Sequence, residues 1–403
     1  MQILRETYQR LLAETKDIYP RQFYKDFKML GRLVGIIGAR GVGKTTFLLH
    51  YLKKNYYHSD QALYVSADNL YFSEHSLLEL TDQFYKEFNG QFLCIDEIHK
   101  YQNWNQELKN IYDSYPQMKI IFSGSSSLDL IHGYYDLSRR VFIKNIYGLS
   151  FREFLEIKLG KNLPVLKFED IILRASSLSK QFSKLPKLIG YFKEYLQTGY
   201  YPIFLELKDR DAYMQSLMGI INKTIFEDIS AFYSLKTNNL EAFKKIIYFI
   251  ATSAPGKINI NKLAKSIKKD NATIADYLEM LRASGLLIYM MNNKKGHNLV
   301  RKAEKIYLNN TNLLQAINDN LGKDINIGAS REIFIANQLL AAGQKIFYTE
   351  IGDIECGKYK LEVGGASKNN QQIKKTANTY LVKDDILIGN KKEIPLYLFG
   401  FLY

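Results

Sequence analysis

Residues 33–46 of the chain read LVGIIGARGVGKTT. The apolar run at 33–37 is short and rich in β-branched residues, as buried parallel strands are, and the residues from Lys44 onward have the apolar spacing of a helix. Between them, glycines at 38, 41 and 43 allow a loop whose backbone N–H groups point inward around a phosphate. The pattern therefore predicts a P-loop; the alternative is a glycine-rich turn without a ligand.

This interpretation gives a role to every residue of the loop. Lys44 is expected to reach the β- and γ-phosphates of ATP, and the Thr45 hydroxyl is expected to ligate Mg²⁺. The helix that begins at Lys44 adds a favourable dipole for an anion. The remaining contacts to the nucleotide are expected from Gly38, Ala39, Arg40, Gly41, Val42, Gly43 and Thr46.

A second motif ends in two acidic residues. Residues 91–97 read QFLCIDE, and Asp96 follows Lys44 by 52 residues. In this Walker B pattern a buried strand places Asp96 beside Mg²⁺, while Glu97 orients and deprotonates the attacking water. A turn at the end of a strand is the alternative. Strands and helices alternate between the two motifs, which predicts an α/β fold with a parallel sheet and the phosphate at the carboxyl ends of its strands.

Two further groups are candidates for contact with the γ-phosphate. The strand expected at 119–122 is followed by a serine-rich segment, in which Ser123 or Ser125 would sense the phosphate and the water; a helix cap is the alternative. Arg139 and Arg140 follow, and one of them would act as an arginine finger in its own or a neighbouring subunit. A basic solvated turn is the alternative for this pair.

Composition limits the class of protein. With 403 residues, 46% of them hydrophobic, the chain is expected to fold into two or three globular domains. Residues 1–16 have helical spacing with interspersed charges, unlike a signal peptide, and no later apolar run approaches the roughly 20 residues of a membrane span. The two cysteines, Cys94 and Cys356, fit a reducing compartment. We therefore expect a cytoplasmic protein without a membrane partner.

The basic charge is concentrated in one segment. The chain has a formal net charge of +14, and residues 257–305 carry eleven Lys and Arg against four Asp and Glu. The order helix, turn, helix, strand, strand across this segment predicts a winged helix, with a packing module as the alternative. The second helix carries two acidic residues, Asp276 and Glu279, and one basic residue, Arg282, so we do not expect it to read nucleobases in a sequence-specific way. Contact with DNA or RNA phosphates is expected from Lys268, Lys269, Lys294, Lys295 and Arg301.

The segments GARGVGKTT, LCIDEIHK, IIFSGSSSL and SRRVFIKNIYGLSFREF resemble AAA-superfamily ATPases of prokaryotes. The C-terminal half of that family is a domain of unknown function with winged-helix and nuclease-like portions. Family members read Gly-Arg-Val near the arginine, whereas this chain has Ser138-Arg139-Arg140-Val141, so the choice between the two arginines stays open.

The resemblance also implies a restriction-endonuclease-like fold near the C-terminus, in which three acidic residues bind Mg²⁺. Glu332, Asp353 and Glu362 match the three acidic positions. Gly364, however, stands where the family's Glu-x-Lys triplet requires lysine, and Lys368 is the nearest substitute. Nuclease activity is therefore not expected.

Together these patterns predict four segments: a P-loop ATPase domain at 1–155, a helical linker or lid at 156–256, a winged helix at 257–310, and a degraded nuclease-like α/β domain at 311–403. The expected function is a Mg²⁺-dependent ATPase that couples nucleotide state to the basic winged helix. The alternatives are a slowly hydrolysing signal-transduction NTPase that acts on a protein partner, and an ATP-gated nuclease effector. Assembly into a homo-oligomer is left open.

Overall fold

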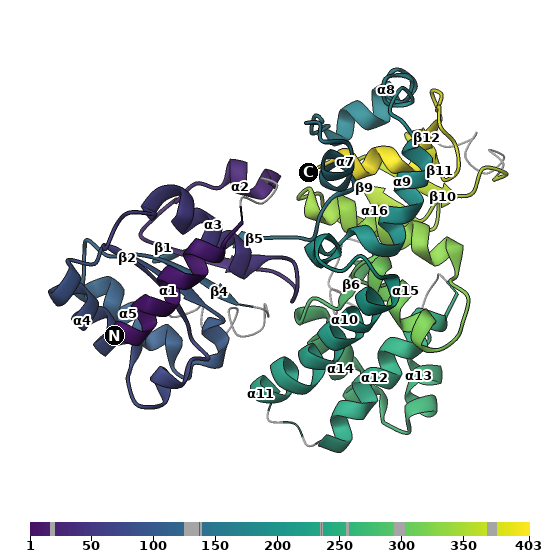
Figure 1. Ribbon diagram of the computed structural model, residues 1–403. Helices are drawn as coiled ribbons and strands as arrows, with labels where there is room; N and C mark the ends of the chain where they lie inside the picture. Colours follow the sequence, from purple (N-terminus) through teal and green to yellow (C-terminus); the bar gives the residue numbers. More distant parts are fainter. Residues whose placement is uncertain are drawn as a thin grey trace. The chain divides into compact units, whose positions relative to one another are not determined.

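The computed structural model describes residues 1–16, 21–124, 137, 139–233, 235, 237–254, 258–293, 303–368 and 377–403. The chain divides into two compact units, Met1–Gly148 and Leu149–Tyr403 (Figure 1). Helix α7, Phe151–Leu159, therefore lies in the second unit. The predicted boundaries at 155, 256 and 310 stay predictions.

The first unit alternates strands with helices. Its helices are α1 (Gln2–Glu14), α2 (Gln22–Asp26), α3 (Lys44–Tyr56), α4 (Leu77–Phe88) and α5 (Trp104–Ser114). Its strands are β1 (Leu33–Ile37), β2 (Ala62–Ser66), β3 (Phe92–Asp96), β4 (Lys119–Gly124) and β5 (Val141–Asn145). Short 3₁₀ helices follow β2 at Leu70–Ser73 and β3 at Ile98–Lys100.

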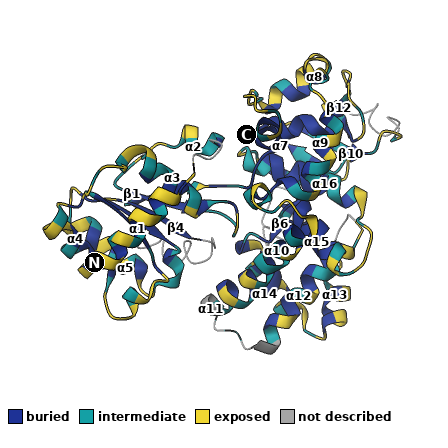
Figure 2. Ribbon diagram, viewed as in Figure 1, coloured by how far each residue is buried: buried dark blue, intermediate teal, exposed yellow. Residues whose placement is uncertain are grey.

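The five strands form one sheet in the order β2-β3-β4-β1-β5, and all neighbours are parallel. The buried residues of this unit are concentrated in these strands (Figure 2), as expected for a sheet with helices on both faces. A parallel sheet with a glycine-rich loop after β1 is the P-loop NTPase fold, which confirms the predicted fold class. Strand β5 was not predicted, because its partly exposed residues lack the continuous apolar pattern of β1.

The second unit begins with helices. These are α7, α8 (Phe168–Phe182), α9 (Leu188–Glu194), α10 (Arg210–Lys223), α11 (Ser230–Tyr233) and α12 (Thr237–Thr252). Single π-helical turns continue α9 at Tyr195–Gly199 and α10 at Thr224–Ile229, and a 3₁₀ helix covers Pro202–Leu205. The predicted mostly helical character of this region agrees with these elements.

A helix pair and a β-hairpin come next in the chain. They are α13 (Ile260–Ile267), α14 (Asn271–Ala283), β6 (Leu287–Met291) and β7 (Ala303–Leu308), with β6 and β7 antiparallel. Asn259 and Asp270 cap the two helices, each accepting a backbone N–H bond from the third residue after it. The elements follow the order that the sequence predicts for a winged helix.

The chain ends in a second sheet. Helices α15 (Thr311–Asn320) and α16 (Ile327–Ala341) precede strands β8 (Ile346–Tyr348), β9 (Ile354–Cys356), β10 (Tyr359–Gly364), β11 (Thr379–Lys383) and β12 (Glu393–Pro395). The order is β12-β11-β10-β9-β8; β10, β11 and β12 pair in parallel, while β8, β9 and β10 pair antiparallel.

The apolar C-terminal segment corrects one expectation. The ten-residue apolar run at 394–403 is too short for a membrane span and by itself predicts a buried strand. In the structure only the three-residue strand β12 forms, and a 3₁₀ helix occupies Leu396–Phe401. The segment is buried as expected. Apolar runs this short do not distinguish a strand from a helix by periodicity. Within the described residues, no helix combines the length and the apolar character needed to span a bilayer.

Candidate nucleotide site

The predicted P-loop lies between β1 and α3. Gly41 and Gly43 have φ angles of 83° and 96°, in the left-handed region that favours glycine. Gly38 packs against the next strand along the sheet: a Cβ atom at this position would lie 2.2 Å from the carbonyl oxygen of Ile146. Ile146 is held there because its N–H donates to the Ile37 carbonyl at 2.8 Å. The loop thus needs glycine for two reasons, backbone conformation and contact with Ile146, the residue after β5.

Lys44 is buried and its ammonium group lies over its own loop. Nζ donates to the carbonyl oxygens of Gly38 at 3.0 Å and Ala39 at 3.1 Å. A phosphate held inside the loop would meet this ammonium and the N-terminus of α3 at the same point. Thr45, the next residue, is exposed at the mouth of the loop.

Asp96, at the carboxyl end of β3, is the centre of the polar contacts at this edge of the sheet. Its side chain is only 2% exposed. Oδ2 accepts hydrogen bonds from the Thr45 hydroxyl at 2.5 Å and the Tyr64 hydroxyl at 2.9 Å. Oδ1 accepts from the Ser123 hydroxyl and from the Glu97 backbone N–H at 3.1 Å. Residues from β2, β3, β4 and α3 therefore converge on one carboxylate.

These donor groups fit Mg²⁺. The predicted metal residues, Thr45 and Asp96, offer a hydroxyl and a carboxylate in direct contact, and oxygen ligands of this kind are those Mg²⁺ prefers beside nucleotide phosphates. In the described parts of the chain no group of three or more His, Cys, Asp or Glu side chains is placed to hold a metal by itself. A Mg²⁺ ion held by Thr45 and Asp96 would therefore need phosphate oxygens and water to complete its coordination.

Glu97 adopts an unusual backbone conformation immediately after β3. Its φ is 50°, so the chain turns sharply there and leads into the 3₁₀ helix Ile98–Lys100. The Glu97 side chain is 23% exposed, but its Oε2 is buried and lies 3.3 Å from Nε2 of His99, whose side chain is buried. The predicted base is thus partly exposed and lies beside an imidazole.

The two candidate serines are not equally well placed by the structure. Strand β4 lies between β1 and β3, so Ser123 reaches the Asp96 carboxylate, and its Oγ also accepts from the Glu97 N–H at 3.3 Å. Ser125 lies outside the described residues. The placement of Ser123 supports a part in the site through Asp96.

The two candidate arginines also differ. Arg140 makes a two-pronged ion pair with Asp113, with Nε to Oδ1 and Nη2 to Oδ2 both at 3.0 Å. Arg139 is exposed and makes no hydrogen bond or ion pair with the described residues. Arg140 is therefore occupied within its own chain, and Arg139 is the better candidate for contact with a phosphate.

Sequence reasoning missed two residues of this region. Tyr64 lies in the middle of β2, where an apolar strand gave no sign of a functional hydroxyl; burial raises its pKa, and the Asp96 carboxylate raises it further. Arg21 is buried, and in the sequence it lies outside both motifs. Its guanidinium donates to the carbonyl oxygens of Val42 at 2.8 Å, Tyr147 at 2.8 Å and Gly148 at 2.6 Å. Arg21 thereby ties the P-loop to the segment after β5, which no local pattern could have indicated.

The predicted phosphate contacts of the winged helix are only partly described. Lys268 is exposed at the end of α13 with φ at 59°, and Lys269 donates to Asn239 Oδ1 at 3.1 Å. Lys294, Lys295 and Arg301 lie outside the described residues. On α14, Arg282 pairs with Glu279 of the same helix, Nε to Oε2 at 2.9 Å, and the absence of base-specific readout stays a prediction.

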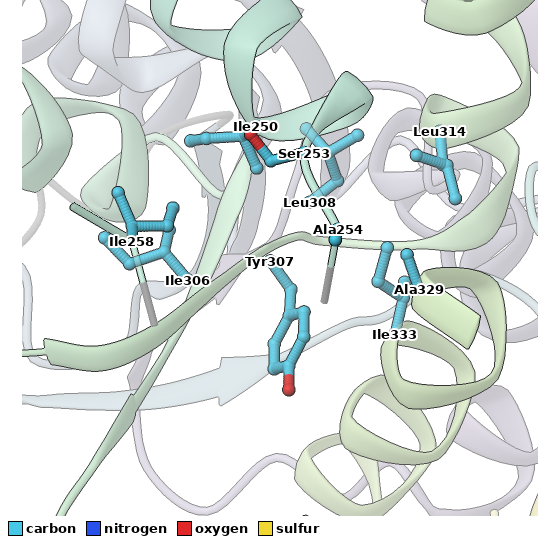
Figure 3. A pocket seen from close by; sticks show the side chains of 10 residues that line it. All are labelled: Ile250, Ser253, Ala254, Ile258, Ile306, Tyr307, Leu308, Leu314, Ala329 and Ile333. Atoms are coloured by element: carbon cyan, nitrogen blue, oxygen red, sulfur yellow. The ribbon is translucent and has the colours of Figure 1, made fainter. Parts of the chain in front are cut away.

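Among the described residues of the second unit, two hollows were compared with a nucleotide site, and neither resembles one. One is an apolar cavity of about 20 Å³ lined by Ile250, Ile306, Tyr307 and neighbours (Figure 3). That volume is room for about one water molecule. The other is an open hollow of about 330 Å³ around Phe168, Gln344 and Cys356. The nucleotide site therefore rests on the P-loop and its surroundings.

Comparisons with known proteins agree with this assignment for the first unit. Residues 31–155 match the family model described as "AAA domain", and residues 189–324 match a domain of unknown function, DUF8612. The N-terminal region thus carries an AAA domain. No curated protein matches the chain in sequence.

Among solved structures, the chain is similar to AMPPCP-bound DnaA from Aquifex aeolicus, with 16% identity and a TM-score of 0.27, over 69% of this chain and 87% of that one. It is also similar to C. elegans PCH-2, with 15% identity and a TM-score of 0.28, over 52% and 63% of the two chains. A katanin structure gives 14% identity and a TM-score of 0.23, over 40% and 58%.

Proposed function

We propose that the first unit binds ATP with Mg²⁺ and hydrolyses it, and that the nucleotide state is passed to the second unit. The observation that carries the proposal is the contact between the Thr45 hydroxyl and the Asp96 carboxylate at the carboxyl edge of a parallel sheet, next to a loop on which the Lys44 ammonium lies. Ligands of open α/β sheets bind at this edge. The AAA domain match over residues 31–155 supports the same class of function.

Each residue would act through a contact already present in the site. The Lys44 ammonium would exchange the carbonyl oxygens of Gly38 and Ala39 for β- and γ-phosphate oxygens. Thr45 and Asp96 would separate to share the metal, while Tyr64 and Ser123 keep the carboxylate oriented. When bound, Mg²⁺ would neutralise the charge that develops on the phosphate oxygens.

Glu97 would orient a water molecule and accept its proton. Its backbone is fixed by the N–H bonds to Asp96 and Ser123, so the carboxylate starts from a defined position beside the phosphate site. Arg139 would supply a positive charge to the γ-phosphate.

Two variants test this proposal. Lys44→Ala is expected to abolish ATP binding, because it removes the cation that faces the phosphates; titration calorimetry measures this. Glu97→Gln is expected to keep ATP and Mg²⁺ binding but to lose turnover by about 10²–10⁴-fold, because an amide cannot accept the proton. Unchanged ATP affinity in the first variant, or turnover within about tenfold of the parent in the second, contradicts the assigned roles.

One observation favours a second candidate function, a slowly hydrolysing switch that acts on a protein partner. Glu97 Oε2 lies 3.3 Å from Nε2 of His99, a distance at which a protonated imidazole would pair with the carboxylate. A carboxylate paired in this way would accept a proton less readily, and such a protein would bind ATP and turn it over rarely. Steady-state hydrolysis with and without DNA or RNA separates the two candidates, because stimulation by nucleic acid is expected only of the first.

We further propose that the basic winged-helix segment contacts nucleic-acid phosphates. The segment's excess of seven positive charges supports this, while the Arg282–Glu279 pair on α14 argues against base readout. Replacing four lysines with Gln should weaken binding to unrelated sequences alike. The slope of log affinity against log salt should fall by about 0.9 for each duplex-DNA phosphate that no longer meets a lysine. The four are Lys268, Lys269, Lys294 and Lys295.

A matched variant removes the same charge elsewhere on the second unit. It replaces four exposed lysines, Lys161, Lys167, Lys180 and Lys184, with Gln. This control should leave the salt slope within about 0.9 of the parent's, the value for a single phosphate. Equal effects of the two sets, or no binding by the parent, would assign the winged helix to protein contacts instead.

A further inference from the structure

Three carboxylates of the second unit occupy the positions at which the family resemblance implies Mg²⁺ ligands: Glu332 on α16, Asp353 before β9 and Glu362 on β10. The first two share a cation of the protein itself. Nζ of Lys305, on β7, lies 2.8 Å from Glu332 Oε2 and 2.9 Å from Asp353 Oδ1. Lys305 is 6% exposed, so this contact is shielded from water.

The same carboxylates have further donors. The Tyr307 hydroxyl donates to Glu332 Oε2 at 2.5 Å, and the Val363 N–H donates to Asp353 Oδ2 at 2.9 Å. Lys305, Tyr307, Glu332 and Asp353 are called the Lys305 cluster below. Both oxygens of Asp353 therefore have donors, and Glu332 Oε2 has two.

We infer that the Lys305 ammonium takes the place of the divalent cation in this acidic site, so that the nuclease-like portion is a metal-independent internal clamp. A divalent ion would approach carboxylate oxygens to about 2.0–2.6 Å. An ion that close to both oxygens would overlap the ammonium that already bridges them. The residues present thus do not fit a bound metal while Lys305 is in place.

The charges agree with this geometry. The Lys305 ammonium lies between two carboxylates, Glu332 and Asp353, whose side chains are only 10% and 17% exposed. Without a cation two carboxylates would face each other in a buried site, which is strongly unfavourable.

The third carboxylate has a lysine as well. Gly364 occupies the triplet position where lysine is required, and a Cβ atom there would lie 2.1 Å from Cδ of Lys368. The Lys368 side chain therefore fills the space in which a side chain at 364 would begin. Its Nζ forms an ion pair with Glu362 and donates to the Val363 carbonyl at 2.8 Å. Lys368, in the following turn, thus supplies the amino group that Gly364 lacks. The position of the metal ion, between Glu332 and Asp353, is occupied by the Lys305 ammonium.

The Lys305 cluster also joins two parts of the second unit. Lys305 belongs to the β6–β7 hairpin, whereas Glu332 and Asp353 belong to α16 and to the C-terminal sheet. A second set of contacts reinforces the same junction: Asn292 pairs with Tyr348 next to β6, and Asn293 Nδ2 donates to Glu355 Oε1 at 2.6 Å. The hairpin is therefore fixed to the sheet from both of its strands.

Binding of Mn²⁺ to the full chain without nucleotide tests the inference, with electron paramagnetic resonance to count bound ions. Lys305→Ala should bind one more Mn²⁺ than the parent, and Lys305→Ala with Asp353→Asn should lose that ion. The thermal unfolding temperature should fall in Lys305→Ala, and added Mn²⁺ should partly restore it. In the parent, Mn²⁺ should not raise the unfolding temperature by binding to Glu332 and Asp353.

The matched control is Lys383→Ala. Lys383 is also buried and pairs with one carboxylate, Glu393, at 2.8 Å. This variant should lose stability without gaining an Mn²⁺ site, because it does not leave two carboxylates facing each other. A gain of Mn²⁺ equal to that of Lys305→Ala would overturn the inference, as would no gain in Lys305→Ala.

A measurement on the parent keeps the inference testable if Lys305→Ala does not fold. The parent and Asp353→Asn should bind the same number of Mn²⁺ ions, since Lys305 already occupies the site. Loss of a bound Mn²⁺ in Asp353→Asn would show that the parent holds a metal there and would overturn the inference.

Discussion

Gly38→Ala tests the packing of the P-loop against β5 without removing any group that would touch ATP. The backbone at Gly38 is outside the left-handed region, so alanine can adopt its φ and ψ without strain. The effect is steric: the new Cβ would lie 2.2 Å from the Ile146 carbonyl oxygen. Ordinary contacts between carbon and oxygen are about 3.3 Å, so loop and strand must separate by about 1 Å.

The structure indicates which side moves. Ile146 is held by its hydrogen bond to Ile37 at the end of β1, so the loop is the part expected to shift. That shift moves the Gly38 carbonyl, on which Lys44 rests, and the N–H groups that would surround the phosphate. Overpacking of this kind costs about 1–3 kcal/mol. If the cost falls on the bound state, ATP affinity drops by about 5–150-fold.

The assay pairs ATP titration calorimetry with thermal unfolding in the absence of nucleotide. Gly219→Ala is the matched control, because it lies within α10 and a Cβ atom there meets nothing within 4 Å. That variant should keep its ATP affinity and gain about 0.5–1 kcal/mol of stability, as expected when alanine replaces a helical glycine. If Gly38→Ala binds ATP as tightly as the parent and unfolds at the same temperature, the argument from the Ile146 contact is wrong.

Two further predictions follow from the placement of single residues. Arg139→Ala is expected to lose turnover by about 10³-fold or more, the lower range for an arginine finger. Arg140→Ala should keep its turnover within about tenfold of the parent's, because the ion pair of Arg140 with Asp113 serves stability. Equal losses of steady-state hydrolysis in the two variants would contradict this assignment. Burial raises the pKa of Cys94 well above its ordinary value and that of Cys356 to about 12. At pH 8 both thiols should therefore stay protonated in the native protein and should react with Ellman's reagent only after unfolding. Rapid reaction of either thiol in the native protein would contradict its burial.

The nucleotide site could be read largely from the sequence, because its signals are local. The P-loop needs glycines at fixed positions between a strand and a helix, and the Walker B pattern needs an apolar strand before its carboxylates. Those constraints appear as residue types and spacing, so Lys44, Thr45, Asp96 and Glu97 were identified without coordinates, although their roles stay predictions. The same locality explains why the helix pair and hairpin at 260–308 were anticipated.

Only the tertiary structure determined the contacts between residues that are distant in the chain. Tyr64 reaches Asp96 because β2 pairs with β3, and Arg21 reaches the P-loop from a segment with no motif of its own. The family resemblance implied Glu332 and Asp353 as metal ligands. Lys305, from a strand of the hairpin, fills the space between them, which no spacing rule reveals. Strand order and side-chain burial set these contacts, and both arise only when separate elements pack together.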